Sequence, residues 1–372
     1  MTAFEDLLTW RESSTSGEAI AAAIDAASRA PAAARDILDA AERIVITGAG
    51  SSYYLAQAVA ATGRAVLRRP VIAAPLSELI LRPEGVLVGA LNAPAGPVEG
   101  SERPAEPARL AAGREPVVII SRSGSTSEAI SVVERMRSAG HATVAVTCRA
   151  DSPLATGADV TLVSPAGDEA AIVMTRSFAS MLALLLSVVA IVGGDDRLVA
   201  DLGRLSGRWA EAVAAAETGR RLGATDWSQV VVLGGGPALG IAAEWGLKLT
   251  ETSQVPTSAY EPLEFRHGPI SVCEPGILVV GLIGGAGSRE EAAVVREAAR
   301  LGASTWLVAT NDDDTPGATG DVSLIGGGLH PSARLPLLVH PAHALALSLA
   351  LTRDRDPDAP RHLGQVVILD PA

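Results

Sequence analysis

The stretch EPVVIISRSGSTSEAISVVERMRSAG, residues 115–140, followed by ATVAVTC at 142–148, determines the fold class of this chain. It begins with an apolar, β-branched run, continues through a loop rich in serine and glycine, and ends in a segment with helical spacing. The order is therefore strand, polar loop, helix, strand. Both strands are apolar throughout rather than alternating, which is typical of a parallel sheet covered by helices on both faces.

The same order of elements occurs on both sides of this stretch. RIVITGAGSSYYLAQAVAATGRAV (43–66) predicts a strand, a loop and a helix before it, and SQVVVLGGGPALGIAAEWGLKLTETS (228–253) begins a second series. That series continues through GILVVGLIGG (276–285), STWLVAT (304–310) and VSLIG (322–326). Two successive α/β units predict two domains of similar architecture. The expected division is an N-terminal helical segment at 1–40, domains at 41–200 and 201–354, and a closing tail at 355–372.

The composition excludes several classes of function. With 372 residues, 48% of them apolar and 19% charged, the chain is globular and long enough for two cores. Its net charge of −12 offers no basic surface for nucleic acid or for an anionic membrane. Cys148 and Cys273 are too few for a disulfide framework or a structural zinc site, so we expect a reducing compartment and no metal centre.

The sequence shows no export or membrane signal. The N-terminus, MTAFEDLLTWRESSTS, has acidic residues and no apolar core, so it does not read as a signal peptide. The most apolar run, residues 180–194, is shorter than the about 20 residues that span a bilayer. We expect a buried helix there and a cytoplasmic protein. The Pro- and Gly-rich segment 91–110 predicts a surface excursion within the first domain.

Three loops follow predicted strands and lead into helices, which is where doubly wound sheets bind ligands. They are GAGSSY (48–53), SRSGSTSE (121–128) and GGGPALG (234–240). The first loop lacks a dinucleotide fingerprint, because Tyr53 stands where the third glycine would be and no acidic residue follows at the required distance. A Rossmann cofactor is therefore not expected, and we predict a reaction without any cofactor.

The loop at 121–128 predicts a site for a phosphate group. It presents five hydroxyls at the start of a helix, where free N–H groups and the helix dipole favour an anion: Ser121, Ser123, Ser125, Thr126 and Ser127. The absence of lysine fits a phosphate monoester held by neutral donors rather than a nucleotide on a Walker loop. The alternative is simple capping, with Glu128 and Ser125 forming a capping box. Capping needs one hydroxyl, however, and the loop has five.

Four segments resemble, in order, the motifs of double sugar isomerase (SIS) domain proteins. They are ITGAGSSYY (46–54), VVIISRSGSTSEAI (117–130), AAIVMTRSFASML (170–182) and the long segment from GGGPALG to EFRHGP (234–269). The family includes the isomerase half of glucosamine-6-phosphate synthase, amino-sugar-phosphate deaminases and isomerases, and fructosamine-phosphate deglycases. The resemblance covers about residues 40–370 and implies two tandem SIS domains, each a flavodoxin-like three-layer sandwich.

The resemblance also implies roles for individual residues. The sugar phosphate would be bound by Ser121, Ser123 and Thr126, with the Arg122 backbone, Ser51 and Ser52 nearby. Thr175 and Arg176 match a loop at the edge of the sugar. The family's base matches Glu251, and its histidine in the HGP turn matches His267. In related proteins that histidine reaches into the partner subunit's site, so a homodimer is implied.

These residue types suit the chemistry. Interconverting an aldose and a ketose moves a proton between C1 and C2, which needs a carboxylate base such as Glu251. Opening the sugar ring needs a group that exchanges protons near neutral pH, such as His267. Without the resemblance, Glu251 would more often be exposed at a helix end, and His267 could simply bond a loop carbonyl. Lys248, the only lysine, lies one turn before Glu251 and could tune its pKa, contact the sugar or have no role. Glu264 and Arg266 are expected to hold the turn by ion pairs.

The chain departs from the family pattern in three places. Gln365, in APRHLGQVVILD (359–370), occupies the position of a lysine implicated in ring opening. A glutamine cannot act as a cationic acid, so either His267 and His362 open the ring or the reaction differs. A second family histidine aligns with Pro256. The start MTAF also lacks the N-terminal cysteine of a glutaminase domain, so we do not expect ammonia to be drawn from glutamine.

The leading prediction is an enzyme, either a deaminase or an aldose–ketose isomerase of a hexosamine 6-phosphate. The alternative within this class is a deglycase of a fructosamine phosphate, in which Arg122 or Arg176 would bind an additional carboxylate. The alternative from another class is a sensor that binds a sugar phosphate without turnover. Sensors of this family usually carry one SIS domain together with a basic helix-turn-helix. This sequence indicates two SIS domains and no basic helix-turn-helix.

Overall fold

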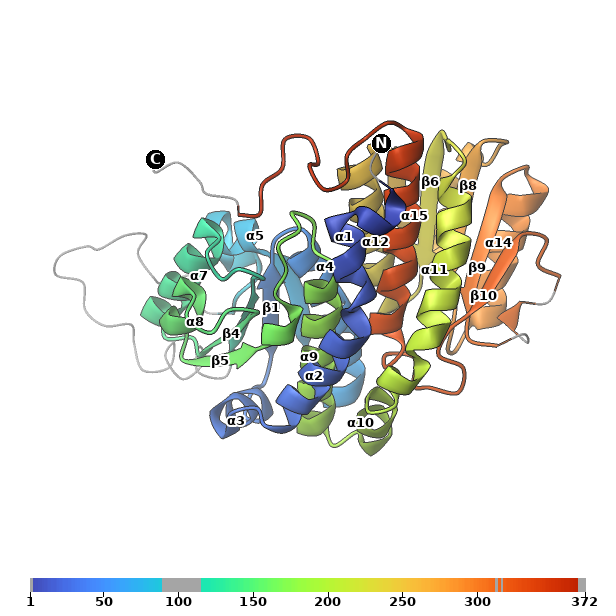
Figure 1. Cartoon of the computed structure of the whole chain (residues 1–372). Helices are drawn as coiled ribbons and strands as arrows, with labels where there is room; N and C mark the ends of the chain where they lie inside the picture. Colours follow the sequence, from blue (N-terminus) through green and yellow to red (C-terminus); the bar gives the residue numbers. More distant parts are fainter. Residues whose placement is uncertain (1–2, 89–114, 312–313, 316, 367–372) are drawn as a thin grey trace.

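The structure, a computed structural model, describes residues 3–88, 115–311, 314–315 and 317–366. The segment 91–110, expected at the surface, lies outside the described residues. In the described part, the chain forms two parallel five-stranded sheets, each with helices on both faces (Figure 1). This architecture confirms the α/β fold predicted from the uniformly apolar strands.

The first sheet has the strand order β2-β1-β3-β4-β5, and all of its strand pairs are parallel. Its strands are β1 (Ile44–Gly48), β2 (Val71–Pro75), β3 (Val117–Ile120), β4 (Thr143–Thr147) and β5 (Val160–Val163). The strand order reverses between β1 and β3, which are adjacent and aligned at Val45 and Val117. In sheets of this order, ligands bind beyond the carboxyl ends of these two strands.

The second sheet repeats the topology of the first. Its order is β10-β9-β8-β6-β7, so its first strand again lies between the second and the third of the series. Its strands are β6 (Gln229–Gly234), β7 (Thr257–Tyr260), β8 (Ile277–Leu282), β9 (Ser304–Ala309) and β10 (Asp321–Leu324). The reversal in strand order therefore falls between β6 and β8.

Both faces of the first sheet are buried, because successive strand residues point to opposite sides. Ile44 and Ile46 belong to the core that the inner helices share, whereas Val45 packs against the outer helices. The inner helices are α2 (Ser16–Ser28), α3 (Ala32–Asp39), α4 (Ser51–Leu67) and α9 (Arg176–Gly193). The outer helices are α5 (Leu76–Leu81), α7 (Ser127–Ala139) and α8 (Pro153–Gly157). Burial on both sides explains why these strands are apolar at nearly every position.

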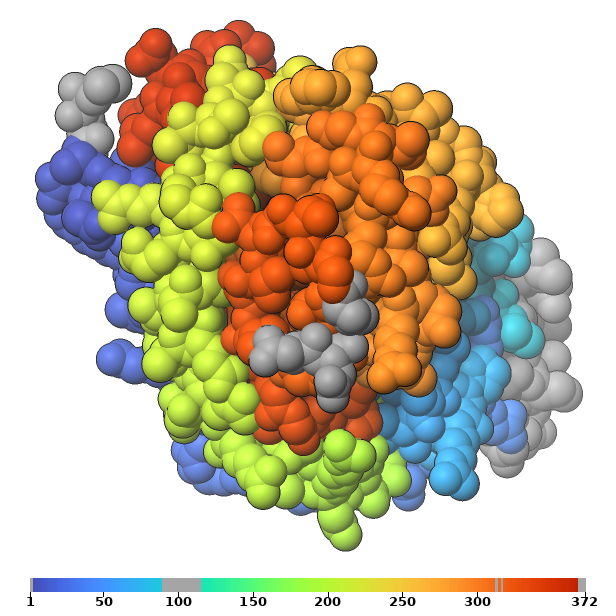
Figure 2. All heavy atoms as spheres, turned by 90° about the vertical axis from the view of Figure 1, so that its right-hand side faces the viewer, coloured from blue at the N-terminus to red at the C-terminus, as the bar shows by residue number. Residues whose placement is uncertain are grey.

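The second sheet is covered in the same way. Its inner helices are α11 (Trp209–Gly223), α12 (Ala238–Ser253) and α15 (Val339–Thr352), and its outer helices are α13 (Pro262–Phe265) and α14 (Ser288–Arg300). Figure 2 shows this side of the molecule, where α11 (yellow-green) and α14 (orange) are both visible. The inner helices of both domains share one continuous hydrophobic core. Two short helices, α1 (Leu8–Ser14) and α10 (Asp196–Leu202), pack against α15 and α9 respectively.

Two helices among the described residues are long and apolar enough, by length and composition, to cross a membrane. They are α9 and the segment Leu335–Thr352, which contains α15. Their most apolar windows are 78% and 89% buried inside the protein. Helix α9 packs on α2 and α4, and α15 packs on α11 and α12. Their apolar surfaces are therefore covered by protein, as predicted for the run at 180–194.

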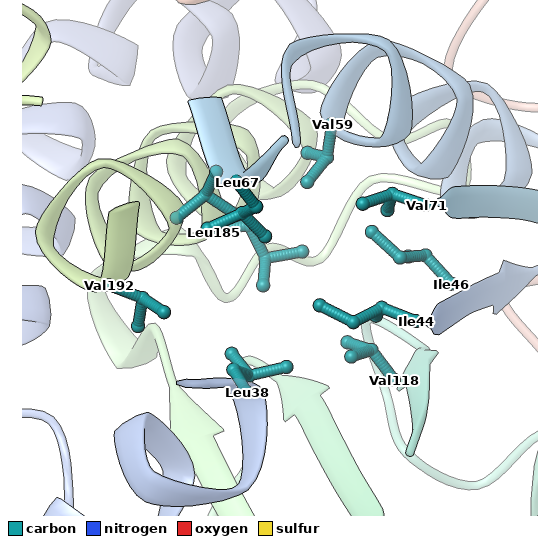
Figure 3. Close-up of a pocket in the computed structure, with 10 residues that line it drawn as sticks. Leu38, Ile44, Ile46, Val59, Leu67, Val71, Val118, Leu185 and Val192 are labelled. Atoms are coloured by element: carbon teal, nitrogen blue, oxygen red, sulfur yellow. The ribbon is translucent and has the colours of Figure 1, made fainter. Parts of the chain in front are cut away.

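A small void lies in the first domain between the sheet and its inner helices (Figure 3). It is lined only by apolar side chains, among them Leu38, Ile46, Val118 and Leu185. Its volume is about 10 Å³, close to the minimum for a single water molecule. The void is therefore a packing gap in the core and too small for a ligand.

Candidate functional site

The carboxyl ends of β1 and β3 place two loops rich in hydroxyl groups at the same edge of the sheet. The first loop leads into α4 with Ser51 and Ser52, and the second runs from Ser121 to Thr126 before α7. Ser51 and Ser52 are each 5% exposed, and Ser121 and Ser123 are 5% and 6% exposed. These buried hydroxyls at two helix N-termini are neutral donors of the kind that the predicted phosphate site requires.

Hydrogen bonds within the loop at 121–126 fix its shape. Gly124 N donates to Ser121 Oγ at 3.2 Å, and Ser121 Oγ lies 3.3 Å from Thr126 Oγ1. Gly124 has a φ of +62°, and a Cβ there would lie 2.1 Å from a neighbouring serine hydroxyl, so this turn requires glycine. Thr126 is the N-cap residue of α7, and its side chain makes no capping hydrogen bond. The predicted capping box, which places the cap at Ser125, therefore does not match the start of this helix.

Thr175 and Arg176 begin α9, and both are bonded to other parts of the chain. Thr175 is fully buried, and its N–H and its hydroxyl donate to the Glu169 carboxylate at 2.9 and 2.6 Å. The Arg176 guanidinium donates to the Asp168 carbonyl and lies 3.5 Å from Glu12 of α1 in an ion pair. The charge of Arg176 is thus used within the protein, where it connects α9 to α1.

Helix α12 carries three ionisable residues on one face, Glu244, Lys248 and Glu251. Lys248 is 1% exposed, and its Nζ lies 2.5 Å from Glu251 Oε2 and 3.5 Å from Glu244 Oε1. Glu244 is completely buried, and no donor of the described residues satisfies either carboxylate oxygen with a well-formed hydrogen bond. The Glu251 side chain is 20% exposed. The array therefore has a closed end at Glu244 and an open end at Glu251.

The array has unusual protonation properties. Burial raises the pKa of Glu244 to about 8, with Lys248 opposing the shift and Glu251 adding to it. Burial alone would lower the pKa of Lys248, but the carboxylates of Glu244 and Glu251 outweigh it and raise that pKa. Near neutral pH, Glu244 binds a proton while Lys248 stays cationic. Groups that change protonation in this range are typical of sites of proton transfer.

Helix α12 crosses the start of α4, which brings residues of the two domains together. A Cβ on Gly240 would lie 2.5 Å from the Tyr54 backbone oxygen, so glycine permits the close approach. The pKa of Tyr54 is raised by burial first and then by neighbouring charges, that of Glu244 foremost. The Ser51 hydroxyl, in turn, lowers the pKa of Glu244. The carboxylates of α12 therefore lie beside the hydroxyls at the start of α4.

His267 lies in an exposed turn after α13. Its backbone N–H donates to the Glu264 carbonyl at 2.9 Å, and its imidazole makes no hydrogen bond or ion pair with any residue the structure describes. Arg266 forms an ion pair of 2.8 Å with Glu297 of α14, which holds the turn as expected. The ion pair expected for Glu264 is not found among the described residues. Its backbone carbonyl accepts the hydrogen bond from His267 N–H instead. Within one chain, no described contact joins His267 to Glu251.

The C-terminal tail returns from α15 to the first domain, as the red trace in Figure 1 shows. Asp358 accepts a hydrogen bond of 2.7 Å from Leu8 N at the start of α1. Farther along, Arg122 Nη2 donates to the Gln365 backbone oxygen at 3.1 Å, and Gln365 Nε2 donates to the Ala170 oxygen. Gln365 therefore lies beside the loop at 121–126, and it is bonded to a residue of that loop.

Side chains of the protein fill the corresponding position in the second sheet. Arg334, which is 3% exposed, donates to the Ile283 and Val308 carbonyls at 2.6 and 3.1 Å. The Glu291 carboxylate lies so close to Gly235 that a Cβ there would be 2.1 Å from Oε1. The loop after β6 also carries no hydroxyl group. The candidate site is therefore the one in the first domain, with α12 of the second domain beside it.

Sequence reasoning did not find two residues of this region. Glu244 could have been found, because it lies four residues before Lys248 and so on the same helix face. Glu169 gives no local signal, since its importance arises from contacts with Arg122 and Thr175 that only the folded chain creates.

A family model described as SIS domain matches residues 97–191 and 225–324 of the chain. Two curated relatives are named glutamine–fructose-6-phosphate aminotransferase (isomerizing). The one from Aeropyrum pernix is 31% identical over 276 residues, which cover 69% of this chain and 44% of that protein. The one from Pyrobaculum aerophilum is 30% identical over 266 residues, covering 68% and 43%. This chain therefore spans less than half the length of these relatives.

Three solved structures have the same fold. The C-terminal domain of glucosamine-fructose-6-phosphate aminotransferase from Francisella tularensis has a TM-score of 0.81 at 17% identity, covering 96% of this chain and 100% of that one. Tagatose-6-phosphate ketose/aldose isomerase from Escherichia coli has a TM-score of 0.78 at 21% identity, covering 100% and 98%. Glucosamine-6-phosphate deaminase from Thermotoga maritima has a TM-score of 0.72 at 23% identity, covering 97% and 99%.

Proposed function

Because the chain belongs to the family of SIS domain proteins, we propose that it is an enzyme acting on a sugar phosphate, specifically a deaminase or an aldose–ketose isomerase of a hexosamine 6-phosphate. The observation that carries the proposal is the array of Glu244, Lys248 and Glu251 beside the buried hydroxyls of the first domain. The named relatives support it, since aminotransferase, deaminase and ketose/aldose isomerase are all names of proteins acting on sugar phosphates.

In this proposal the phosphate binds at the two loops after β1 and β3. Its donors are Ser121, Ser123 and Thr126, with Ser51, Ser52 and the Arg122 backbone nearby. The net charge of −12 repels an anion at long range, so binding must depend on such a local cluster of donors. The site is built from the first domain (41–200) and the second (201–354), and the tail (355–372) closes it.

Glu251 is the proposed base. It moves a proton between C1 and C2 of the open-chain sugar through an enediol or enolamine, and its partly exposed carboxylate can be reached by a ligand. Lys248, 2.5 Å from Glu251, orients the base and stabilises the negative charge that develops on the sugar oxygen. Glu244 lies on the far side of Lys248 and holds a proton near neutral pH.

His267 is the proposed ring-opening group, and it acts in the neighbouring subunit's site of a homodimer. Its exposed imidazole has no partner among the described residues of its own chain, which supports a role outside that chain. Gln365 offers no cationic acid to share this work. A mixture of Glu251→Gln and His267→Asn variants tests the arrangement, because each mixed dimer would contain one complete site. We expect about one quarter of the wild-type activity after random reassociation, and no recovery would contradict the shared site.

The deglycase alternative receives less support from the structure. It needs a guanidinium free to bind an additional carboxylate, whereas Arg122 is bonded to Ala171 and Gln365, and Arg176 to Asp168 and Glu12.

We also propose a cytoplasmic location, because Cys148 and Cys273 are both free thiols, as in a reducing compartment.

A substrate panel tests the proposed function. The protein is incubated with glucosamine 6-phosphate, galactosamine 6-phosphate, fructose 6-phosphate with ammonia, or a fructosamine 6-phosphate, and the released ammonia or amine and the sugar phosphate product are measured. We expect turnover of at least one hexosamine 6-phosphate. Tight binding of a sugar phosphate without turnover would instead favour the sensor, and turnover of a fructosamine phosphate alone would favour the deglycase.

A further inference from the structure

A buried polar junction lies behind the proposed phosphate site, and Glu169 is at its centre. The Glu169 side chain has no exposed surface. Its carboxylate accepts hydrogen bonds from Thr175 N (2.9 Å), from Thr175 Oγ1 (2.6 Å) and from Ser177 Oγ. Arg122 Nη1 lies 3.5 Å from the same carboxylate in an ion pair. One carboxylate therefore joins the start of α9 to a residue of the loop at 121–126.

Arg122 extends the junction to the C-terminal tail. Its Nη1 donates to the Ala171 oxygen at 2.9 Å, and its Nη2 donates to the Gln365 oxygen at 3.1 Å. Gln365 Nε2 donates to the Ala170 oxygen, so the tail is bonded to both sides of the junction. The Arg122 backbone is also held, because its oxygen accepts a bond of 3.0 Å from Cys148 N after β4. Both the backbone and the guanidinium of Arg122 are therefore fixed.

The N-terminal helix α1 holds the same segment from another side. The Glu12 carboxylate accepts hydrogen bonds from Ala170 N (2.7 Å) and Ala171 N (2.8 Å). The backbone of Ala170 and Ala171 is thus bonded through its N–H groups to α1 and through its carbonyls to Arg122 and the tail. A buried network in which each member has a partner is rigid, and loss of one member affects the others.

We propose that Glu169 is a positioning residue of the phosphate site. Through Arg122 it holds the loop at 121–126, through Thr175 it holds the start of α9, and Gln365 of the tail locks the same arrangement. The inference rests on the proposed function for its substrate, a sugar phosphate. A phosphate bound by neutral donors depends on their placement to within about half an ångström, so the support behind the loop sets the affinity.

Glu169→Gln tests the proposal, because an amide presents an N–H₂ group to donors that now face a carboxylate. We expect KM for the sugar phosphate to rise about tenfold with a smaller change in kcat, and inorganic phosphate to weaken as an inhibitor by a similar factor. Gln365→Ala should raise KM by a smaller factor. In the double variant, Glu169→Gln with Gln365→Ala, KM should rise by less than the product of the two single-variant factors.

Glu115→Gln is the matched control. Glu115 is also a buried carboxylate, 3% exposed, that pairs with an arginine, Arg43, but it lies at the amino end of β3. Its substitution removes the same charge from the same domain without touching the junction. We expect a comparable loss of thermal stability with KM within about twofold of wild type. A KM increase in Glu115→Gln equal to that in Glu169→Gln would overturn the positioning role.

Hydrogen exchange separates failure of this inference from failure of the proposed function. Glu169→Gln should exchange faster than wild type at the amides of 121–126 and of 361–366, whether or not a substrate is known, and Glu115→Gln should not. Unchanged protection of either segment in Glu169→Gln would overturn the inference. If the wild type neither binds nor turns over any sugar phosphate, the proposed function fails and so does the positioning of a phosphate.

Discussion

Replacing Glu244 by glutamine should make the protein more stable at neutral pH and less active. Burial raises the pKa of Glu244 from the ordinary 4.5 to about 8. At pH 7 the folded chain must therefore bind a proton that the unfolded chain does not, at a cost of about 3 kcal/mol for 2.5 pH units. Glutamine has a similar shape and no charge to neutralise. Its amide adds one buried donor without a partner, at about 1 kcal/mol, so the net gain in unfolding free energy is about 2 kcal/mol.

The gain depends on pH with a definite sign. Below pH 4.5 both the folded and the unfolded carboxyl are protonated, so the wild type bears no cost there. As pH rises from 4.5 to about 8, the unfolded state loses its proton and the folded state keeps it, so the wild type loses stability over this window. The variant should therefore equal or fall below the wild type at pH 4 and exceed it at pH 7. Activity should fall about tenfold or more, because a glutamine cannot bind and release a proton near neutral pH as Glu244 does.

Urea denaturation at pH 4, 6, 7 and 8 measures this effect, followed by tryptophan fluorescence. Trp245, adjacent to Glu244 and fully buried, is a local probe. Glu297→Gln, which removes the exposed ion pair with Arg266, is the control and should change stability by less than about 1 kcal/mol at any pH. A variant that is several kcal/mol less stable at pH 7, with no dependence on pH, would refute the reasoning. Glu244 would then be an ionised, stabilising partner of Lys248.

Two further predictions concern the phosphate loop and the acid stability of the fold. Ser123→Ala should raise KM for the sugar phosphate about tenfold, whereas Ser138→Ala, on the exposed side of α7, should leave it unchanged in steady-state kinetics. Equal KM values in the two variants would contradict a phosphate at this loop. Burial lowers the pKa of His340 to about 4 from its ordinary 6.5, so its contribution is complete above pH 6.5 and is lost as pH falls toward 4. We expect about 2 kcal/mol of loss between pH 7 and 5 from this residue, and a flatter pH profile of thermal unfolding for His340→Gln. A variant profile as steep as that of the wild type would contradict this.

Local patterns were sufficient to predict most strands of both sheets and the loops, but not β2, β5 and β7, which are partly exposed edge strands. Apolar runs without alternation indicated parallel strands buried on both faces, and the Gly/Ser segments after them indicated the loops beside β1 and β3. The helix at 180–194 was predicted as buried because it lacks charges and is short. Its observed start at Arg176 depends on contacts with Asp168 and Glu12 that no local pattern contains.

The parts that the sequence did not reveal depend on contacts between distant residues. Glu12 bonds to Ala170 across 158 positions, and Arg122 bonds to Gln365 across 243. Such pairs have no characteristic spacing, so the sequence did not reveal the contacts of the Arg122 guanidinium with Glu169 and Gln365, and Glu169 was overlooked. The resemblance to a family supplied Glu251 and His267, whereas the burial that explains Glu244 required the packing of α12 against α4.

Exchange of the substrate's carbon-bound protons with solvent tests the central claim most directly. The wild type and Glu251→Gln are each incubated with the hexosamine 6-phosphate or ketose 6-phosphate in D₂O, and deuterium at C1 and C2 is followed by NMR, with binding of the sugar phosphate measured in parallel. The account predicts exchange in the wild type and a loss of about 100-fold or more in Glu251→Gln, with binding nearly unchanged. Undiminished exchange in Glu251→Gln, or tight binding by the wild type with no exchange at all, would contradict it.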